Sequence, residues 1–565
     1  MANFGGWLIA TLKRWLIYII GGVVILAILA VGAFYMAAPY LNSFVKDEMV
    51  KHGVKADQSE VTVAGNVNLK NVTLPVPEGV TLKIGAISGR PPVGFVPGSF
   101  TIYNIDLKRE NIHVEIPEVT LSGITLKDKD TSIESHVLQA LMRVDVSSVN
   151  APNIEVSLAN PNGETEKLDI KGFWLSNLKA GNIGSVGIDG MSTNVGLKNS
   201  DTNSGDGLRL IGKSNAMRAD DIDVGYAYSI LAGKIKPDKV GRTVFGPVEL
   251  GDIAIDVYEG TNRNAHFSLD KFKTNGLKMH PMQDVPETLA RTYLEAKKSG
   301  DEKNEKAARN ALLVTLVSAI TAIDAEVEKA DIDLPKIKAS LNSFQLLPRE
   351  WNQPVPESLL VSLNGLSLNT SEMPQKDFEI LRNMGFKTLD LSGKIDFSYN
   401  SRGKTLALND LSFTANGIGS GQMSATIINA EPALFSGDKD ASLDAANRIG
   451  ITKADMRYSD FGFIDKLFTY LAQNLNDNKH DLKQELYEDF YVVMTKSPAM
   501  LLKDHDEAQK ISSAFGAFAK KPGTLKISLE AKDNKGLTAT DLETALQNDL
   551  ATALNKVNLT VKNEN

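Results

Sequence analysis

The sequence contains no cysteine. Disulfides, thiolate nucleophiles, iron–sulfur clusters and cysteine-ligated zinc sites are therefore excluded. An excess of basic residues is also missing, because 61 lysines and arginines stand against 69 aspartates and glutamates, for a formal net charge of −8. Domains that bind nucleic acid are usually basic, since they neutralise phosphates. We therefore predict no nucleic-acid partner.

Recognisable catalytic and metal-binding motifs are absent as well. The histidines form neither H-E-x-x-H nor a close pair, so no metal site is predicted. Residues 417–421 (GIGSG) place serine one position too late for a nucleophile elbow. Residues 207–214 (GLRLIGKS) match the P-loop string, but a polar loop precedes them and their LRLI segment resembles a strand. We predict no enzyme activity, no cofactor and no catalytic residue; a hydrolase whose carboxylates are dispersed along the chain is the enzymatic alternative.

One segment of the sequence has the length and composition of a membrane span. The run from Trp15 to Met36 (WLIYIIGGVVILAILAVGAFYM) carries no charge, and as a helix it would extend about 33 Å. Lys13 and Arg14 precede it, which predicts a cytoplasmic N-terminus. A cleaved signal peptide is the alternative, but its apolar region would be only about 7–15 residues long. We therefore predict an uncleaved, single-pass anchor in the lipid bilayer, bounded by Trp15 and Met36.

Beyond the anchor, most of the sequence alternates apolar and polar residues, which is typical of strands in a two-faced sheet. Helical texture is confined to Pro286–Asp324 and Leu443–Lys520, and the apolar run Ala311–Ile323 is too short to span a membrane. The predicted fold class is α+β: a transmembrane helix, then an extended, twisted, mostly antiparallel sheet with two helical insertions. The predicted ranges are 1–40 (stub and anchor), 41–280 (β-rich), 281–330 (helical insertion), 331–430 (β-rich), 431–520 (helical) and 521–565 (β-α-β).

A repeated pattern, Φ-x-Φ-x-[Asn/Gly/Asp]-Φ-x-Φ with Φ apolar, marks the predicted strands. Clear copies are VNLKNVTL (67–74), VTLSGITL (119–126), VELGDIAI (248–255), VSLNGLSL (361–368) and LALNDLSF (406–413). The alternation slips by one residue within each copy, and a bulged residue would keep the apolar positions on one face. The predicted bulge positions are Asn71, Gly123, Asp252, Gly365 and Asp410. The predicted lining of an apolar groove is Leu69, Leu74, Leu121, Leu126, Leu250, Leu363 and Leu408.

The anchor followed by repeated L-x-N-Φ-x-Φ strands resembles the AsmA-like group of bacterial inner-membrane proteins, and the architecture is also similar to the YdgA-like periplasmic proteins. The best local matches are Leu69–Leu74, Leu121–Leu126 and Leu408–Phe413. Residues 456–473 (MRYSDFGFIDKLFTYLAQ) resemble a stretch of related bacterial proteins. The resemblance implies a body in the periplasm and an extended, curved sheet whose apolar groove is proposed to carry phospholipid. The helical insertions depart from that pattern.

Two functions follow as hypotheses. In the first, a protein of the inner membrane handles phospholipid or maintains the envelope through an open apolar β-groove. In the second, it is a non-enzymatic envelope scaffold or interaction protein, with a dry core covered by its own helices. Half-buried sheets of any β protein show the same alternation, so the sequence pattern does not choose between them. Protein partners are not indicated by the sequence.

Overall fold

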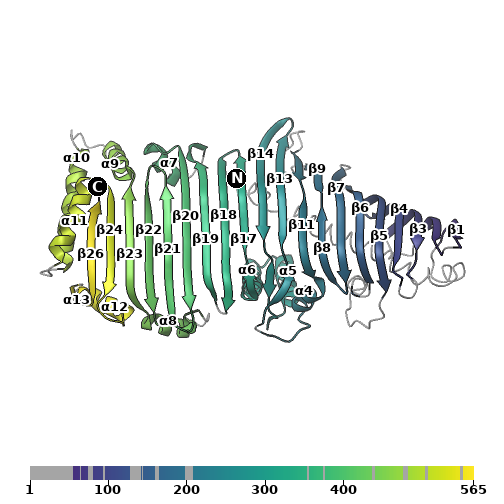
Figure 1. Cartoon of the computed structure of the whole chain (residues 1–565). Coiled ribbons are helices and arrows are strands. Elements are labelled where there is room, and N and C mark those ends of the chain that lie inside the picture. The colour runs from purple at the N-terminus through teal and green to yellow at the C-terminus, as the bar shows by residue number, and fades with distance from the viewer. Residues whose placement is uncertain are drawn as a thin grey trace. The chain divides into compact units, whose positions relative to one another are not determined.

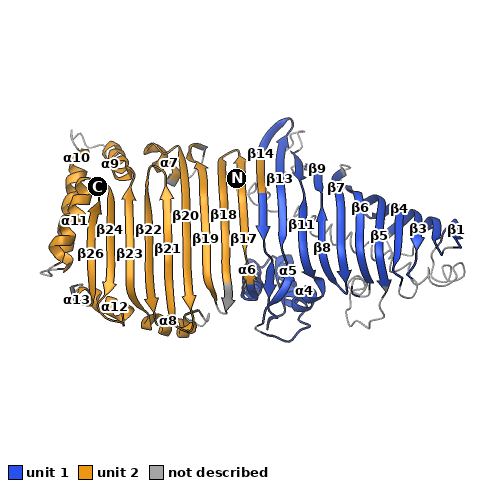
Figure 2. Cartoon of the chain, viewed as in Figure 1, with its two compact units in different colours: residues 1–264, 271–321 blue, residues 265–270, 322–565 orange. Residues whose placement is uncertain are grey.

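The computed structural model describes residues 55–564, except residues 64, 74–79, 93–95, 127–141, 143, 160–164, 198–207, 239, 353–354, 373–375, 436–438, 475–481, 503–506 and 548–550. The predicted anchor Trp15–Met36 and the position of Leu74 lie outside this part of the chain. No helix among the described residues is both long and apolar enough to span a bilayer. The chain divides into two compact units, residues 1–264 with 271–321 and residues 265–270 with 322–565 (Figure 2).

Unit 1 is built on an antiparallel sheet in which consecutive strands pair from β1 to β8 (Figure 1). Its strands are β1 (Gln58–Val61), β2 (Val67–Thr73), β3 (Val80–Arg90), β4 (Gly98–Arg109), β5 (Ile112–Leu126), β6 (Val144–Ala159), β7 (Thr165–Lys179), β8 (Asn182–Ile188), β9 (Gly190–Leu197), β10 (Leu208–Ser214), β11 (Met217–Asp223) and β13 (Val248–Glu259). Both β8 and β9 pair with β7, and both β10 and β11 pair with β13. Beside β7, the two short strands β8 and β9 thus take the place of one long strand, and beside β13 the two short strands β10 and β11 do the same.

A smaller layer of unit 1 combines short strands with helices. It contains α4 (Val224–Leu231), β12 (Arg242–Phe245), β15 (Leu277–Met279), α5 (Pro286–Ser299), α6 (Glu302–Ser318) and β16 (Ile320–Ile323), which begins in this unit. Tyr226 and Ile230 of α4 pack against Met279 and Ala319 in a separate apolar cluster. The strand β14 (Asn262–Thr274) contributes residues to both units.

Unit 2 contains a second run of antiparallel strands, paired in sequence order from β17 to β24, with β26 next to β24 and β25 beside β23. The strands are β17 (Ala325–Leu334), β18 (Ile337–Asn352), β19 (Val355–Asn369), β20 (Thr388–Asn400), β21 (Thr405–Ala415), β22 (Gly419–Ile428), β23 (Gly450–Asp460), β24 (Thr524–Ala531), β25 (Leu537–Thr538) and β26 (Val557–Glu564). The helices are η1 (Thr370–Glu372), α7 (Lys376–Asn383), η2 (Pro432–Phe435), α8 (Lys439–Arg448), α9 (Phe463–Asn474), α10 (Leu482–Leu502), α11 (Ala508–Lys520), α12 (Ala539–Gln547) and α13 (Ala551–Leu554). The prediction of a mostly antiparallel α+β chain is confirmed.

Two helices and a strand lie within the first predicted helical stretch, Pro286–Asp324. Helices α5 and α6 fill the predicted stretch, and Gly300 separates them with a left-handed φ of 72°. The apolar run Ala311–Ile323 is not one helix, because α6 ends at Ser318 and β16 follows at Ile320–Ile323. Three of the four β16 residues are β-branched, which favours an extended backbone.

The second predicted helical block contains a strand that the sequence analysis missed. Strand β23 lies between α8 and α9, within Leu443–Lys520. It pairs with β22 on one side and with β24 on the other, so it is an interior strand of the sheet. The alternation of β23 is hard to recognise in the sequence because helical segments flank it on both sides. Its pairing with two neighbouring strands supplies hydrogen bonds that a sequence pattern cannot show.

The slips in alternation keep apolar residues on one face, as predicted. Val67, Leu69 and Val72 are all buried although they do not alternate strictly. Asn71, where the slip occurs, has a left-handed φ of 51°. It is not an extra bulged residue, however, because Lys70 pairs with Ala86 and Val72 with Ile84, which leaves the register unchanged.

The register survives because neighbouring strands slip at the same place. Gly85 of β3 lies opposite Asn71, and Asn104 of β4 (φ 54°) lies opposite Gly85. A second line of facing positions crosses β5, β6, β7, β8 and β11 at Gly123, Ser147, Asn177, Gly184 and Asp221. Left-handed residues occupy alternate strands of that line, with φ of 66° at Gly123, 53° at Asn177 and 52° at Asp221.

The facing residues in these lines are small for a steric reason. A Cβ atom on Gly184 would lie 2.9 Å from the Cβ of Asn177, and one on Gly85 would lie 3.0 Å from that of Asn104. Real Cβ atoms do not approach so closely, and each left-handed asparagine in these lines accordingly has a glycine opposite it on one of its neighbouring strands.

One-sided bulges, in which only one of two paired strands carries an extra residue, occur at or next to other predicted positions. In β19 the pairing with β20 shifts between Leu363 and Leu366, on either side of Gly365. In β21 the pairing shifts toward both β20 and β22, and because Asp410 pairs with Asp396 and Leu408 with Phe397, the extra residue is Asn409, next to the predicted Asp410. Beside Gly123 the register shifts only toward β4. Asp252 has a φ of 45°, but the pairs Met217–Leu250 and Lys213–Ala254 on either side of it keep the same register. Asp252, like Asn71, is therefore a slip without an extra residue.

Deleting Asn71 should strongly destabilise unit 1. The deletion would leave no residue of β2 opposite Gly85. The side chains on one side of the deletion, either Val67 and Leu69 or those that follow Asn71, would then turn toward the polar face. Exposing two such side chains costs about 3–6 kcal/mol, at about 1.5–3 kcal/mol each. The free energy of unfolding from denaturant titration measures this cost. Replacing the exposed neighbour, Lys70→Ala, is the control, and equal effects of the two changes would contradict the slip lines.

Candidate functional site

One face of the unit 2 sheet carries rows of apolar side chains that cross many strands. Direct cross-strand pairs join Leu346, Val361, Ile395, Leu411, Met423, Met456, Ile527 and Val561. A second row joins Leu359, Phe397, Leu408, Ala425, Ala454, Leu529 and Leu559. Because each residue of a row is the direct cross-strand partner of the next, these residues form one continuous apolar face.

The opposite face is polar in the same register. The row of residues directly next to the first apolar row, on the side away from the second, consists of Ser362, Lys394, Ser412, Gln422, Arg457, Lys526 and Lys562. The Lys394 ammonium lies 3.3 Å from Asp410 and 3.3 Å from Asp396. Its hydrogen bond to Asp410 is the largest cause that raises the pKa of Lys394, so this lysine stays charged. One face of the unit 2 sheet is therefore apolar, and the other is polar and charged.

The apolar face of unit 2 is open in its centre. The exposed fraction is 42% for Ile395, 50% for Phe413 and 49% for Met456. Phe413 lies flat over its cross-strand partner, since a Cβ atom on Gly421 would come within 2.2 Å of the ring. Covering a glycine with an aromatic ring is a common way to protect a sheet, but it leaves the outer side of the ring exposed. We refer to Leu363, Ile395, Leu411, Phe413 and Met456 as the apolar band.

Helices α7 and α9 lie at one end of the unit 2 strands and α8 lies at the other, as Figure 1 shows. At one end Leu389 and Leu391 pack with Phe463 and Leu467 of α9. At the other end, the Tyr399 ring meets Phe435 of η2 at 5.1 Å between centroids, and its hydroxyl donates to the Ala430 carbonyl. The band lies between these covered ends.

The C-terminal side of the face is covered by α11. The Tyr458 ring of β23 lies 6.2 Å from that of Phe518, edge to face. Burial raises the pKa of Tyr458 to about 12, with a further contribution from the nearby Asp460 carboxylate. The phenol therefore stays neutral at physiological pH, as a residue at an apolar contact must.

The predicted lining residues have different surroundings in the two units. Leu69 and Leu121 are buried in unit 1, with exposed fractions of 3% and 0%, so they are core residues and not an open lining. Leu250 in β13 is half-buried. Leu363 and Leu408 are half-buried on the open face of unit 2. The backbone of Leu126 ends β5, but its side chain, like all of Leu74, lies outside the described residues.

The helices that could have covered these leucines pack elsewhere. Leu316 and Ile320, from the run Ala311–Ile323, pack in the cluster around Tyr226 of α4. Phe463 of α9 packs near Leu389 at the strand ends. Neither of these two apolar clusters, as described, includes Leu363 or Leu408.

Two residues of the apolar band, Ile395 and Met456, were not predicted from the sequence. Ile395 lies outside every copy of the repeated pattern, and Met456 lies in β23, which was predicted to be helical. The alternation of Ile395 and Phe397 within β20 is the signal that identifies the face from sequence.

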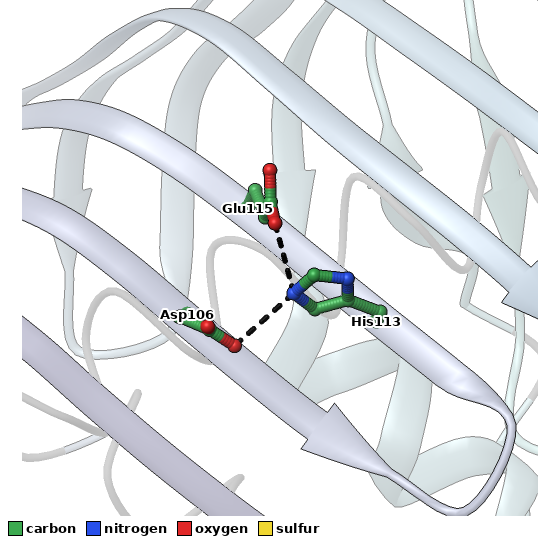
Figure 3. Close-up of side chains that lie close together, drawn as sticks. All are labelled: Asp106, His113 and Glu115. Carbon is green, nitrogen blue, oxygen red and sulfur yellow. Dashed lines mark hydrogen bonds and ion pairs between the residues drawn. The ribbon is translucent and has the colours of Figure 1, made fainter.

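A separate polar cluster lies on the hairpin of β4 and β5 in unit 1 (Figure 3). His113 Nε2 is 3.1 Å from Asp106 Oδ1 and 3.1 Å from Glu115 Oε1. These are residue types that bind divalent metals. The group could not be predicted from the sequence because Asp106 comes from the neighbouring strand, and only the H-x-E spacing of His113 and Glu115 is visible along the chain.

The P-loop-like string does not form a phosphate-binding loop in the part that the structure describes. Residues Leu208–Ser214 form strand β10, paired with β9 and β13 on its two sides. Their backbone amides are therefore available to the ladders of a sheet and not to a phosphate, in agreement with the strand-like interpretation of the sequence.

Comparison with known proteins gives little functional information. A family model described only as an uncharacterized protein matches residues 412–564, from β21 to the last strand. No curated protein and no solved structure matches the chain.

Because Leu121 in unit 1 is fully buried and Leu363 in unit 2 is only half-buried, the same substitution should lower the free energy of unfolding by different amounts at the two positions. Leu121→Ala should destabilise the protein by about 2–5 kcal/mol, because it leaves a cavity in a fully buried site. Leu363→Ala should cost less than half as much, since its side chain is already in contact with solvent and leaves no closed cavity. Denaturant titration of both variants checks this difference. Equal costs would show that Leu363 is a buried core residue, which would contradict an open face.

Proposed function

We propose that this chain is a membrane-tethered lipid-handling protein of the bacterial envelope, in which the apolar band of unit 2 holds acyl chains. The exposed row through Ile395, Leu411 and Met456 is the observation that carries the proposal. Soluble proteins rarely expose contiguous apolar surface without a use for it, and such surfaces mark binding sites or interfaces. The resemblance to the AsmA-like proteins supports a lipid as the occupant.

An acyl chain suits the band better than a compact ligand does. The rows run across the strands, so the apolar surface is long and lacks any polar group that would fix the orientation of a small molecule. The cross-strand partners of the row residues are themselves apolar. Burial of each methylene contributes about 0.8 kcal/mol, so that an acyl chain of ordinary length can bind after its entropy losses.

The second candidate function is a scaffold with a dry core. The buried leucines of unit 1, including Leu69 and Leu121, favour that interpretation for unit 1 alone. In this view the band of unit 2 would bind another protein and not a lipid. The scaffold and the lipid carrier differ in what copurifies with the folded protein.

Phospholipid should copurify with the full chain and should be lost from Phe413→Glu. A carboxylate in the band would have to be desolvated against an acyl chain, which opposes binding. Thr414→Glu is the matched control, because Thr414 is the exposed next residue of β21 and its partners Ser392 and Ser420 are polar. Native mass spectrometry of protein released from detergent measures the bound lipid. A folded wild-type protein without lipid, or equal loss in both variants, would favour the scaffold.

The body of the protein should lie outside the cytoplasm. We propose that Trp15–Met36 forms the anchor, with Lys13 and Arg14 on the cytoplasmic side. A periplasmic reporter enzyme fused after Asn565 should therefore be active in a bacterial host, and a reporter that works only in the cytoplasm should be inactive there. The reverse result would overturn the proposed location in the inner membrane with a periplasmic body.

A further inference from the structure

We propose that Asp106, His113 and Glu115 form a binding site for a divalent transition-metal ion, Zn²⁺ being the ion that fits best. The three side chains converge from two paired strands, and their ligand atoms all lie within 4.8 Å of one another. Figure 3 shows both carboxylates directed at the same ring nitrogen, Nε2 of His113. One imidazole and two carboxylates form a donor set that zinc accepts.

The geometry around His113 favours one shared cation at this point. Nε2 carries at most one hydrogen, yet two carboxylate oxygens lie 3.1 Å from it. In a tetrahedral zinc site with bonds of about 2.0–2.2 Å, neighbouring ligand atoms are separated by roughly 3.3–3.6 Å. The two separations from Nε2, both 3.1 Å, are within a few tenths of an ångström of that range, so small side-chain rotations would admit the ion.

The charges on the neighbouring strands supply an independent reason for a cation. Asp106, Glu115, Glu155 and Asp169 face one another in register across β4, β5, β6 and β7. Like charges directly opposite each other destabilise a sheet. Lysines compensate two members of the row, since Lys108 lies 3.3 Å from Asp106 and Lys167 lies 2.7 Å from Glu155.

Glu115 is compensated differently. It lies between Asp106 and Glu155 in the row, and its described close side-chain contact is with His113. A divalent ion bound to Glu115, His113 and Asp106 would neutralise the centre of the row. The side chains of His113, Asp106 and Glu115 are 28%, 36% and 55% exposed, so the ion can enter from solvent. With three protein ligands, one coordination position stays open to water or to an anionic ligand.

The choice of zinc follows from the ligands. An imidazole nitrogen suits zinc, copper and nickel, whereas calcium and magnesium prefer sites made entirely of oxygen. The site therefore predicts discrimination between Zn²⁺ on one side and Ca²⁺ or Mg²⁺ on the other.

Isothermal titration of the full chain in detergent with ZnCl₂ tests the proposal. We expect one Zn²⁺ per chain at this site, and His113→Ala should weaken binding by at least about tenfold, because even the loss of an outer-shell partner costs that much. Glu115→Gln should weaken binding similarly. Glu118→Gln is the matched control, since Glu118 is an exposed carboxylate on the same strand outside the cluster.

Cobalt provides a second readout, which reports the coordination of the bound ion. Co²⁺ bound at this site should give visible absorption bands that disappear in His113→Ala, while circular dichroism confirms that the variant is folded. Zn²⁺ binding that is unaffected by His113→Ala would overturn the proposal. So would Ca²⁺ or Mg²⁺ displacing Zn²⁺ at equal concentration, because that result would indicate an all-oxygen site.

Discussion

Cross-strand register is the constraint on which both units depend. A side chain reaches the apolar or the polar face according to its position along the strand, and one unmatched residue would reverse that assignment for the rest of the strand. In unit 1 the slips at Asn71 and Gly85, or at Asn177 and Gly184, occur opposite each other, so the pairing continues unchanged. In unit 2 the extra residues near Gly365 and Asp410 are absorbed by shifts in the pairing with particular neighbours.

Matched slips and one-sided bulges both keep apolar residues on one face, but they place different requirements on the sequence. A line of matched slips needs a left-handed residue on alternate strands and a small residue facing it, because the facing Cβ atoms would otherwise collide. A one-sided bulge needs only a local distortion in one strand, and it increases the twist there. Both keep hydrophobic residues such as Val67, Leu69 and Val72, or Leu408 and Leu411, on one side of the sheet. The apolar band of unit 2 exists because that continuity is maintained from β19 to β23.

Much of this architecture was predictable from the sequence, and the rest depends on contacts between distant residues. Period-two alternation predicted the antiparallel sheet, and the Asn, Gly and Asp positions located the slips. Whether Asn71 was an extra residue could not be predicted, because the answer lies in Gly85 on the next strand. For the same reason the burial of Leu121 and the exposure of Leu363, which occupy equivalent positions in the pattern, were indistinguishable. The group formed by Asp106, His113 and Glu115 also required knowledge of which strands are paired.

The central functional claim is that lipid contacts the apolar face of unit 2 and not its polar face. Neighbouring positions on β21 allow a direct test, since Phe413 and Thr414 are both exposed but belong to opposite faces. A photoreactive phenylalanine analogue can be placed at either position in the full chain, irradiated in bacterial cells, and analysed by mass spectrometry for lipid adducts. The account predicts phospholipid adducts at position 413 and none at position 414. Equal labelling at both positions, or adducts with protein alone at position 413, would contradict it.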